Sequence, residues 1–182
     1  MPPKSPEQIS TASTPTVPFG AYYASAAGGR VRFSASTDYV MINDEGVTDL
    51  ALFVNPPNSG VDCYLDIGEF GASFDARFRR LGGFTHTIPD VSAGPLSRNT
   101  GGGSQVAACR LYRPGQYTVS GGDVRKTAYM RASTNYITMI EGRSVVRPGN
   151  ALAWTIQATR ANIGGRPHGF VHLEWIELPA AS

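Results

Sequence analysis

Three histidines are the side chains best suited to hold a metal ion: His86, His168 and His172. In an extended strand, His168 and His172 share a face but lie roughly 13 Å apart at 3.3 Å per residue, too far to share one ion. The stretch "HGFVHLE" also lacks the His-x-His spacing that many cupins carry on a β-barrel. The sequence therefore predicts no metal site and no cofactor.

The sequence also contains no recognisable motif for nucleophilic catalysis. There is no Gly-x-Ser-x-Gly elbow, and the two cysteines, Cys63 and Cys109, each alternate with core-type neighbours. Both are predicted to be small core residues, and a disulfide between them stays an open alternative.

Paired carboxylates are the remaining catalytic candidates, because two of them at a suitable separation can hydrolyse a glycosidic bond. The sequence offers two such pairs along predicted strands, Asp62 with Asp66 and Glu174 with Glu177. Carboxylates on the outer face of a strand are usually solvated, and we expect these to be. We therefore predict no catalytic residue and no enzymatic activity.

The basic stretch "ARFRRL" contains Arg77, Arg79 and Arg80 around Phe78, a pattern that single-strand nucleic-acid binders use. Arg77 and Arg79 should share one strand face, with Phe78 on the other. A net charge of +2 is too small for a typical nucleic-acid surface. We expect a solvated or intersubunit face and no nucleic-acid partner.

The elements that must position these residues are short strands. Apolar residues recur with a period of two between turns rich in the 21 glycines and 13 prolines, and no window shows a helical stripe. The predicted strands are 47–54, 61–70, 73–81, 84–88, 105–112, 116–120, 126–132, 136–142, 151–158 and 169–178. The pattern predicts an all-β, antiparallel β-sandwich, jelly-roll-like, formed by a single domain over 21–182.

Residues 1–20 are rich in Pro, Ser and Thr and lack a sustained apolar period. They are interpreted either as a mobile terminus or as an extended arm that orders on a neighbouring subunit through Phe19, Tyr22 and Tyr23. The segment has no signal-peptide pattern, and no apolar run is long enough to span a membrane. We expect synthesis in the cytoplasm and no membrane partner.

The stretch "VVRPGNALAWTI" (145–156) is interpreted as a structural turn. Pro148 presets its own φ, and Gly149 or Asn150 tolerates a left-handed conformation. Leu152, Trp154 and Ile156 then fall on one strand face. The turn is predicted to close the sandwich and not to bind a ligand.

Together with "GFVHLEWIEL", this turn resembles the closing hairpin of many tailed-bacteriophage structural proteins. Pro148, Gly149 and Leu152 match its Pro-Gly-x-x-Leu turn, while Trp175 and Glu177 match its final Trp-x-Glu. The upstream "LFVNPPNSGVDCYLDIGEFG" resembles a second element of the same proteins. The residues that carry this second match are Asn55, Pro56, Ser59 and Gly60.

The resemblance implies a non-enzymatic virion structural protein with a jelly-roll-like fold. It implies a capsid decoration, or cement, protein on the virion surface, bound to the major capsid protein and to copies of itself, commonly as a homotrimer. The alternative is a receptor- or glycan-binding head domain of a fibre or spike, with host glycan contacts in the loop 89–104. That long glycine-rich loop departs from the family pattern and leaves the mode of attachment open.

Overall fold

The computed structural model describes residues 32–42, 46–89, 98–99, 106–132, 135–160 and 166–180, of which 67, 98–99 and 135–143 are described by backbone alone. The predicted arm, with Phe19, Tyr22 and Tyr23, and most of the loop 89–104 lie outside the described residues.

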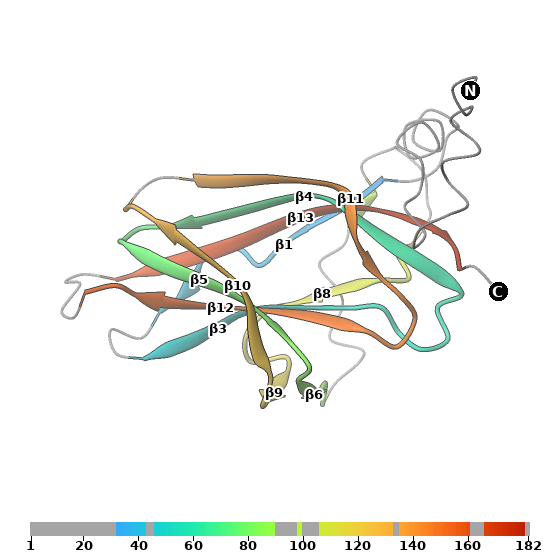
Figure 1. Ribbon diagram of the computed structural model, residues 1–182, viewed down its shortest axis with the longest axis horizontal. Coiled ribbons are helices and arrows are strands. Elements are labelled where there is room, and N and C mark those ends of the chain that lie inside the picture. Colours follow the sequence, from blue (N-terminus) through green and yellow to red (C-terminus); the bar gives the residue numbers. More distant parts are fainter. Residues whose placement is uncertain are drawn as a thin grey trace, which may run out of the picture.

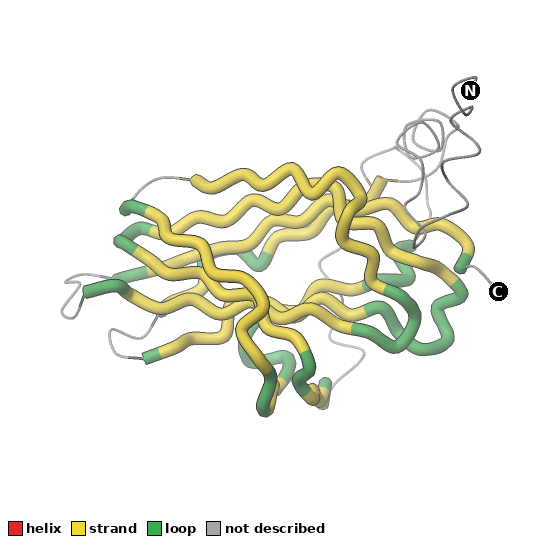
Figure 2. The backbone as a smooth tube through the Cα atoms, viewed as in Figure 1, coloured by secondary structure: helices red, strands yellow, loops and turns green. Residues whose placement is uncertain are grey.

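Two antiparallel sheets pack face to face, and the described residues contain no helix (Figures 1 and 2). One sheet has the order β11-β4-β13-β1 and the other β10-β5-β12-β3. Counted along the chain, the eight strands change sheet at every step except from β5 to β10, which are neighbours in the second sheet, and this is the strand arrangement of a jelly roll. The predicted antiparallel, jelly-roll-like sandwich is confirmed. The strands are β1 (Arg32–Ser36), β3 (Val47–Val54), β4 (Val61–Ala72), β5 (Ala76–Gly82), β10 (Asp123–Met130), β11 (Asn135–Val146), β12 (Ala151–Ala158) and β13 (His168–Pro179).

Strand alternation fills the space between the sheets with aromatic rings. The ring centroid of Trp175 lies 5.9 Å from that of Phe33 and 5.1 Å from that of Phe53. In a second group, the ring centroid of Phe70 lies 5.6 Å from that of Phe78 and 6.1 Å from that of Trp154. The predicted common face of Leu152, Trp154 and Ile156 on β12 is confirmed, because all three pack into this core.

The two turns that carry the family resemblance meet at one end of the sandwich. The N–H of Gly149 donates to the carbonyl of Asn55 at 2.9 Å, and the N–H of Asn55 donates to the carbonyl of Asn150 at 2.9 Å. Gly149 has a φ of 81°, which favours glycine, as the turn prediction allowed. The stretch 145–156 is thus a structural turn, fastened to the turn between β3 and β4.

The segment between β5 and β10 wraps around one side of the sandwich. Its strand β8 (Arg110–Tyr112) pairs with β3, and β7 (Arg98–Asn99) pairs with β1. Its strands β6 (Thr85–Thr87) and β9 (Thr118–Ser120) pair with each other. A second apolar cluster forms where this segment meets the outer faces of β3 and β12. Its buried members are Leu52, Val54, Tyr112, Tyr117 and Ala153.

The remaining edges are β10 and β11. The register of β10 against β5 shifts between Val124 and Lys126, so Arg125 sits at a bulge. A bulge and charged side chains are common protections against pairing with another chain. A two-residue strand, β2 (Val40–Met41), extends the first sheet by pairing with the start of β13.

Candidate binding site at one end of the sandwich

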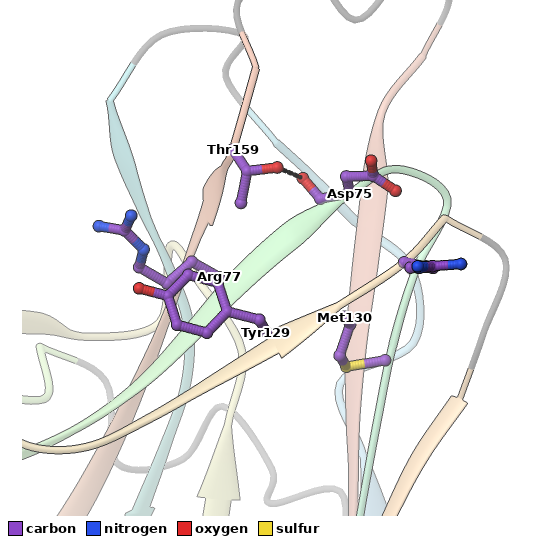
Figure 3. A pocket seen from close by; sticks show the side chains of 6 residues that line it. Asp75, Arg77, Tyr129, Met130 and Thr159 are labelled. Carbon is purple, nitrogen blue, oxygen red and sulfur yellow. Dashed lines mark hydrogen bonds between the residues drawn. The ribbon is translucent and has the colours of Figure 1, made fainter.

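A cavity of about 430 Å³ opens where β5 begins and where β10 and β12 end (Figure 3). Antiparallel pairing brings these ends together, because Ala76 is the register partner of both Met130 and Ala158. The cavity is lined by Asp75, Arg77, Tyr129, Met130, Arg131 and Thr159. Its volume lies within the range of about 300–1,000 Å³ that small-molecule sites occupy.

Tyr129 and Arg77 form one wall. They are register partners on β10 and β5, and the guanidinium carbon of Arg77 lies 5.1 Å from the centroid of the Tyr129 ring. This is the geometry of a cation–π contact. Tyr129 is nevertheless 68% exposed, so the ring offers surface to a partner.

Asp75 and Thr159 form the opposite rim, and backbone hydrogen bonds hold them. The carbonyl of Asp75 accepts from the N–H and from the hydroxyl of Thr159, both at 2.9 Å. The Asp75 Oδ1 atom accepts the N–H of Ala132 at 2.8 Å. Three loops are thereby joined, and Oδ2 of Asp75 has no hydrogen bond to any described residue.

The same end of the sandwich carries most of the exposed apolar side chains. Tyr39 and Met41 lie beside the start of β13, and Val47 lies beside the end of β12. With Tyr129 they make four of the six large apolar side chains that are exposed in the described ranges. Exposed Tyr and Met side chains near Arg are typical of interaction surfaces.

Among the predicted candidates, the cysteines are confirmed as core residues. Cys63 and Cys109 are free, fully buried and close enough for a hydrogen bond between their side chains. Burial, followed by the neighbouring Cys109 side chain, raises the pKa of the Cys63 thiol well above its ordinary value. A thiolate nucleophile is disfavoured there.

The expectation of solvated carboxylates is wrong. Asp62 and Asp66 are each only 8% exposed, because β4 is an interior strand of its sheet, flanked by β11 and β13. Asp66 forms an ion pair with Arg32, and Arg32 also reaches Glu174 at 3.3 Å.

Glu177 has a structural role that its sequence position does not reveal. Its carboxylate accepts the backbone N–H groups of Ala108 and Cys109 at 2.9 and 2.7 Å, and the indole N–H of Trp175 at 3.1 Å. The Trp-x-Glu motif therefore fastens the segment before β8 to β13.

The arginines of "ARFRRL" divide as expected between two faces. Phe78 is 4% exposed in the core, while Arg77 and Arg79, at alternate positions, are on the outer face of β5. Arg80 bridges the sheets by donating to the hydroxyl of Ser144 on β11 at 3.4 Å.

The histidines do not assemble into a metal site. His172 lies 3.7 Å from Glu174, and the His168 ring packs edge-on against Tyr39. Across the described ranges, no three His, Cys, Asp or Glu side chains are grouped as metal ligands.

The cavity was missed by sequence reasoning, except for Arg77. Asp75, Tyr129 and Thr159 lie far apart in the sequence, and only the register of β12, β5 and β10 unites them. The available signal was that one predicted strand begins at residue 73 and two others end at residues 132 and 158.

Fold and cavity together define an antiparallel jelly-roll domain with a cavity of mixed polar and apolar lining at one end. No protein-family model matches the chain, and no curated protein matches it significantly. None of the described segments is a helix with the length and hydropathy to cross a membrane.

Proposed function

We propose that this protein is a virion structural protein without enzymatic activity, a capsid decoration protein that binds and stabilises an assembled head shell. Jelly-roll sandwiches of this connectivity are common in viral capsid domains, but they also occur in lectins and cupins. The fold alone therefore supports the class only in part.

The observation that carries the proposal is the junction between Asn55 and the turn at Gly149 and Asn150. These residues belong to the two elements that resemble tailed-bacteriophage structural proteins, and two backbone hydrogen bonds join them. Trp175 and Glu177, which match the final strand of the closing hairpin, are joined by a hydrogen bond and fasten the segment before β8. The matching residues thus act together to close the sandwich.

The start of the first strand and the cavity lie at opposite ends of the sandwich, and this arrangement supports a mode of attachment to the shell. β1 begins at Arg32, paired with Ile176 near the end of β13. The cavity lies at the other end of the molecule, where β13 begins and β12 ends (Figure 1). The described chain therefore enters its first strand at the end remote from the cavity. If the shell is bound at that end, the cavity end points outward.

In this proposal the partners are the major capsid protein and other copies of the chain in a homotrimer, on the virion surface after synthesis in the host cytoplasm. Phe19, Tyr22 and Tyr23 are the apolar anchors of the arm. A protein that binds the assembled lattice better than free subunits stabilises the lattice by mass action.

The test uses shells purified without this protein. Full-length protein should bind them and raise the temperature at which they release their contents, and protein lacking residues 1–20 should bind weakly. Replacing Phe19, Tyr22 and Tyr23 by alanine should have the same effect, whereas replacing Ser10 and Thr11 by alanine should have none. Equal binding and equal heat protection by the deletion variant would overturn the arm mechanism.

The second candidate, a receptor- or glycan-binding head of a fibre or spike, is favoured by one observation: the exposed Tyr129 ring beside Arg77 at the cavity. Antibody labelling of purified particles distinguishes the two proposed functions, because a decoration protein is on the head shell and a fibre head is on the tail.

A further inference from the structure

We propose that the cavity bounded by Arg77, Tyr129, Asp75 and Thr159 binds a saccharide unit that bears a carboxylate, such as a uronic or sialic acid residue of a glycan. This inference goes beyond a structural role on the shell, and it does not depend on whether the chain belongs to a head or a tail.

The first reason is the tyrosine. The Arg77 guanidinium packs over one face of the Tyr129 ring, and the residue remains 68% exposed. An aromatic side chain that presents an apolar body and a polar hydroxyl suits the C–H face of a pyranose ring. The guanidinium also restrains the ring, so that little conformational freedom is lost on binding.

The second reason is the supply of hydrogen-bonding groups. Sugar hydroxyls both donate and accept, so a saccharide site needs both kinds of group. Asp75 Oδ2 is an acceptor without a hydrogen bond to any described residue, and Arg77 likewise forms no hydrogen bond or ion pair within the described chain. The Thr159 hydroxyl donates a hydrogen bond to the Asp75 carbonyl, so the lone pairs of the hydroxyl oxygen can accept hydrogen bonds from a ligand.

The third reason is charge. The lining contains two guanidinium groups, Arg77 and Arg131, and one carboxylate, Asp75. This balance favours a ligand with a single negative charge. A carboxylate neutralises the formal lining charge of +1, whereas a phosphate monoester, at roughly −1.5 to −2 at neutral pH, would leave the site with a net negative charge.

The rim is built before a ligand arrives. Both bonds from Thr159 to the Asp75 carbonyl, and the bond from Ala132 to the Asp75 carboxylate, hold three chain segments in place. Figure 3 shows Thr159 and Asp75 on one side of the site and Tyr129 with Arg77 on the other. A ligand would therefore meet its contacts in position.

The experiment titrates isotope-labelled full-length protein with methyl β-glucuronide, methyl β-glucoside and AMP, and follows amide chemical shifts by NMR. We expect the glucuronide to bind with a Kd of roughly millimolar order, as suits a ligand of so few atoms. The neutral glucoside and AMP should bind more weakly, and the shifts should centre on 75–77, 129–132 and 159.

Variants test the individual contacts. Tyr129→Ala should weaken glucuronide binding roughly three- to tenfold, and Arg77→Ala at least about tenfold. Arg79→Ala is the matched control, since Arg79 lies on the same face of β5 two residues from Arg77 but does not line the cavity. Tyr39→Ala is the second control, an equally exposed tyrosine outside the cavity. Both controls should bind as the wild type does.

The proposal is wrong if the glucuronide does not bind, if Tyr129→Ala and Arg77→Ala bind unchanged, or if the glucoside or AMP binds as tightly. Arg131→Ala replaces Arg77→Ala if the latter does not fold. Because the isolated protein is used, failure here leaves the shell-binding experiment unaffected, and failure of that experiment leaves this one unaffected.

Discussion

Asn55 and Val146 are 91 residues apart, yet the side-chain amide of Asn55 donates to the carbonyl of Val146 at 2.7 Å. Its second N–H donates to the carbonyl of Val61, also at 2.7 Å. One fully buried amide thus satisfies carbonyls at the end of β11 and the start of β4.

Replacing this amide should be costly. We expect Asn55→Ala to lower the free energy of unfolding by about 2–4 kcal/mol, because the buried Val146 carbonyl loses the amide donor and the part-buried Val61 carbonyl keeps only the Ser59 hydroxyl as a side-chain donor. Asn58→Ala, at an exposed position in the same turn, should change it by less than about 0.5 kcal/mol. Urea denaturation measures both. An Asn55→Ala protein as stable as Asn58→Ala would show that the turn does not depend on the amide.

Both the negative charge and the shape of the Glu177 carboxylate should contribute to the stability of the fold. Glu177→Gln keeps an acceptor but turns an N–H₂ group toward backbone N–H groups, and should cost about 1.5–3 kcal/mol. Amide hydrogen exchange should accelerate in 108–112 before it does elsewhere. Asp123→Asn, at a highly exposed carboxylate, is the control. Unchanged exchange in 108–112 would contradict this role.

Tyr117 should make stability fall in alkaline solution. Burial, and secondarily the charge of Asp49, raise the pKa of its phenol above the ordinary value of 10.0. The unfolded chain therefore loses this proton at lower pH than the folded chain, so stability is complete below about pH 10 and declines above it.

Tyr117→Phe isolates that contribution. The buried hydroxyl has no hydrogen-bond partner among the described residues, so its removal should leave stability at pH 7 equal or up to about 1 kcal/mol higher. The decline between pH 9 and 11 should become shallower. Tyr129→Phe, which changes an exposed phenol, should keep the wild-type slope. Parallel slopes for Tyr117→Phe and the wild type would refute the assignment.

Trp154 tests the structural interpretation of 145–156. Its ring is buried against Phe70, and Trp154→Ala should cost about 3–5 kcal/mol. Thermal or urea unfolding measures the loss, and Trp154→Phe should recover part of it. A Trp154→Ala protein of unchanged stability that had lost binding would instead indicate a ligand site.

Alternation predicted the sandwich well where the pairing of two strands is regular, as between β12 and β5. It failed where the register shifts. Leu65 pairs with Trp175, but Ile67 pairs with Glu174, because the pairing of β4 with β13 slips by one residue between them. The alternation with core-type neighbours that was predicted around Cys63 is therefore interrupted after Leu65. No pattern in a single strand reports such a shift.

Other differences have a similar cause. β1 is absent from the predicted strands, because "RFSAS" has only two inward apolar residues, Phe33 and Ala35. The burial of Asp62 and Asp66 depends on neighbouring strands, which the local sequence does not contain. The cavity likewise exists only through cross-strand register, so only Arg77 was singled out beforehand.

The segment between β5 and β10 fastens the two sheets along the side formed by β1 and β3, where β7 and β8 add to them. On the opposite side, Arg80 donates a hydrogen bond to Ser144 between the sheets. We expect thermal fluctuations to separate the sheets preferentially between β10 and β11, the edge strands to which the described part of the chain adds no further strand, so that water first reaches Met130 and Phe78. The same motion would widen the cavity beside Met130, which couples the slow opening of the core to access at that end of the molecule.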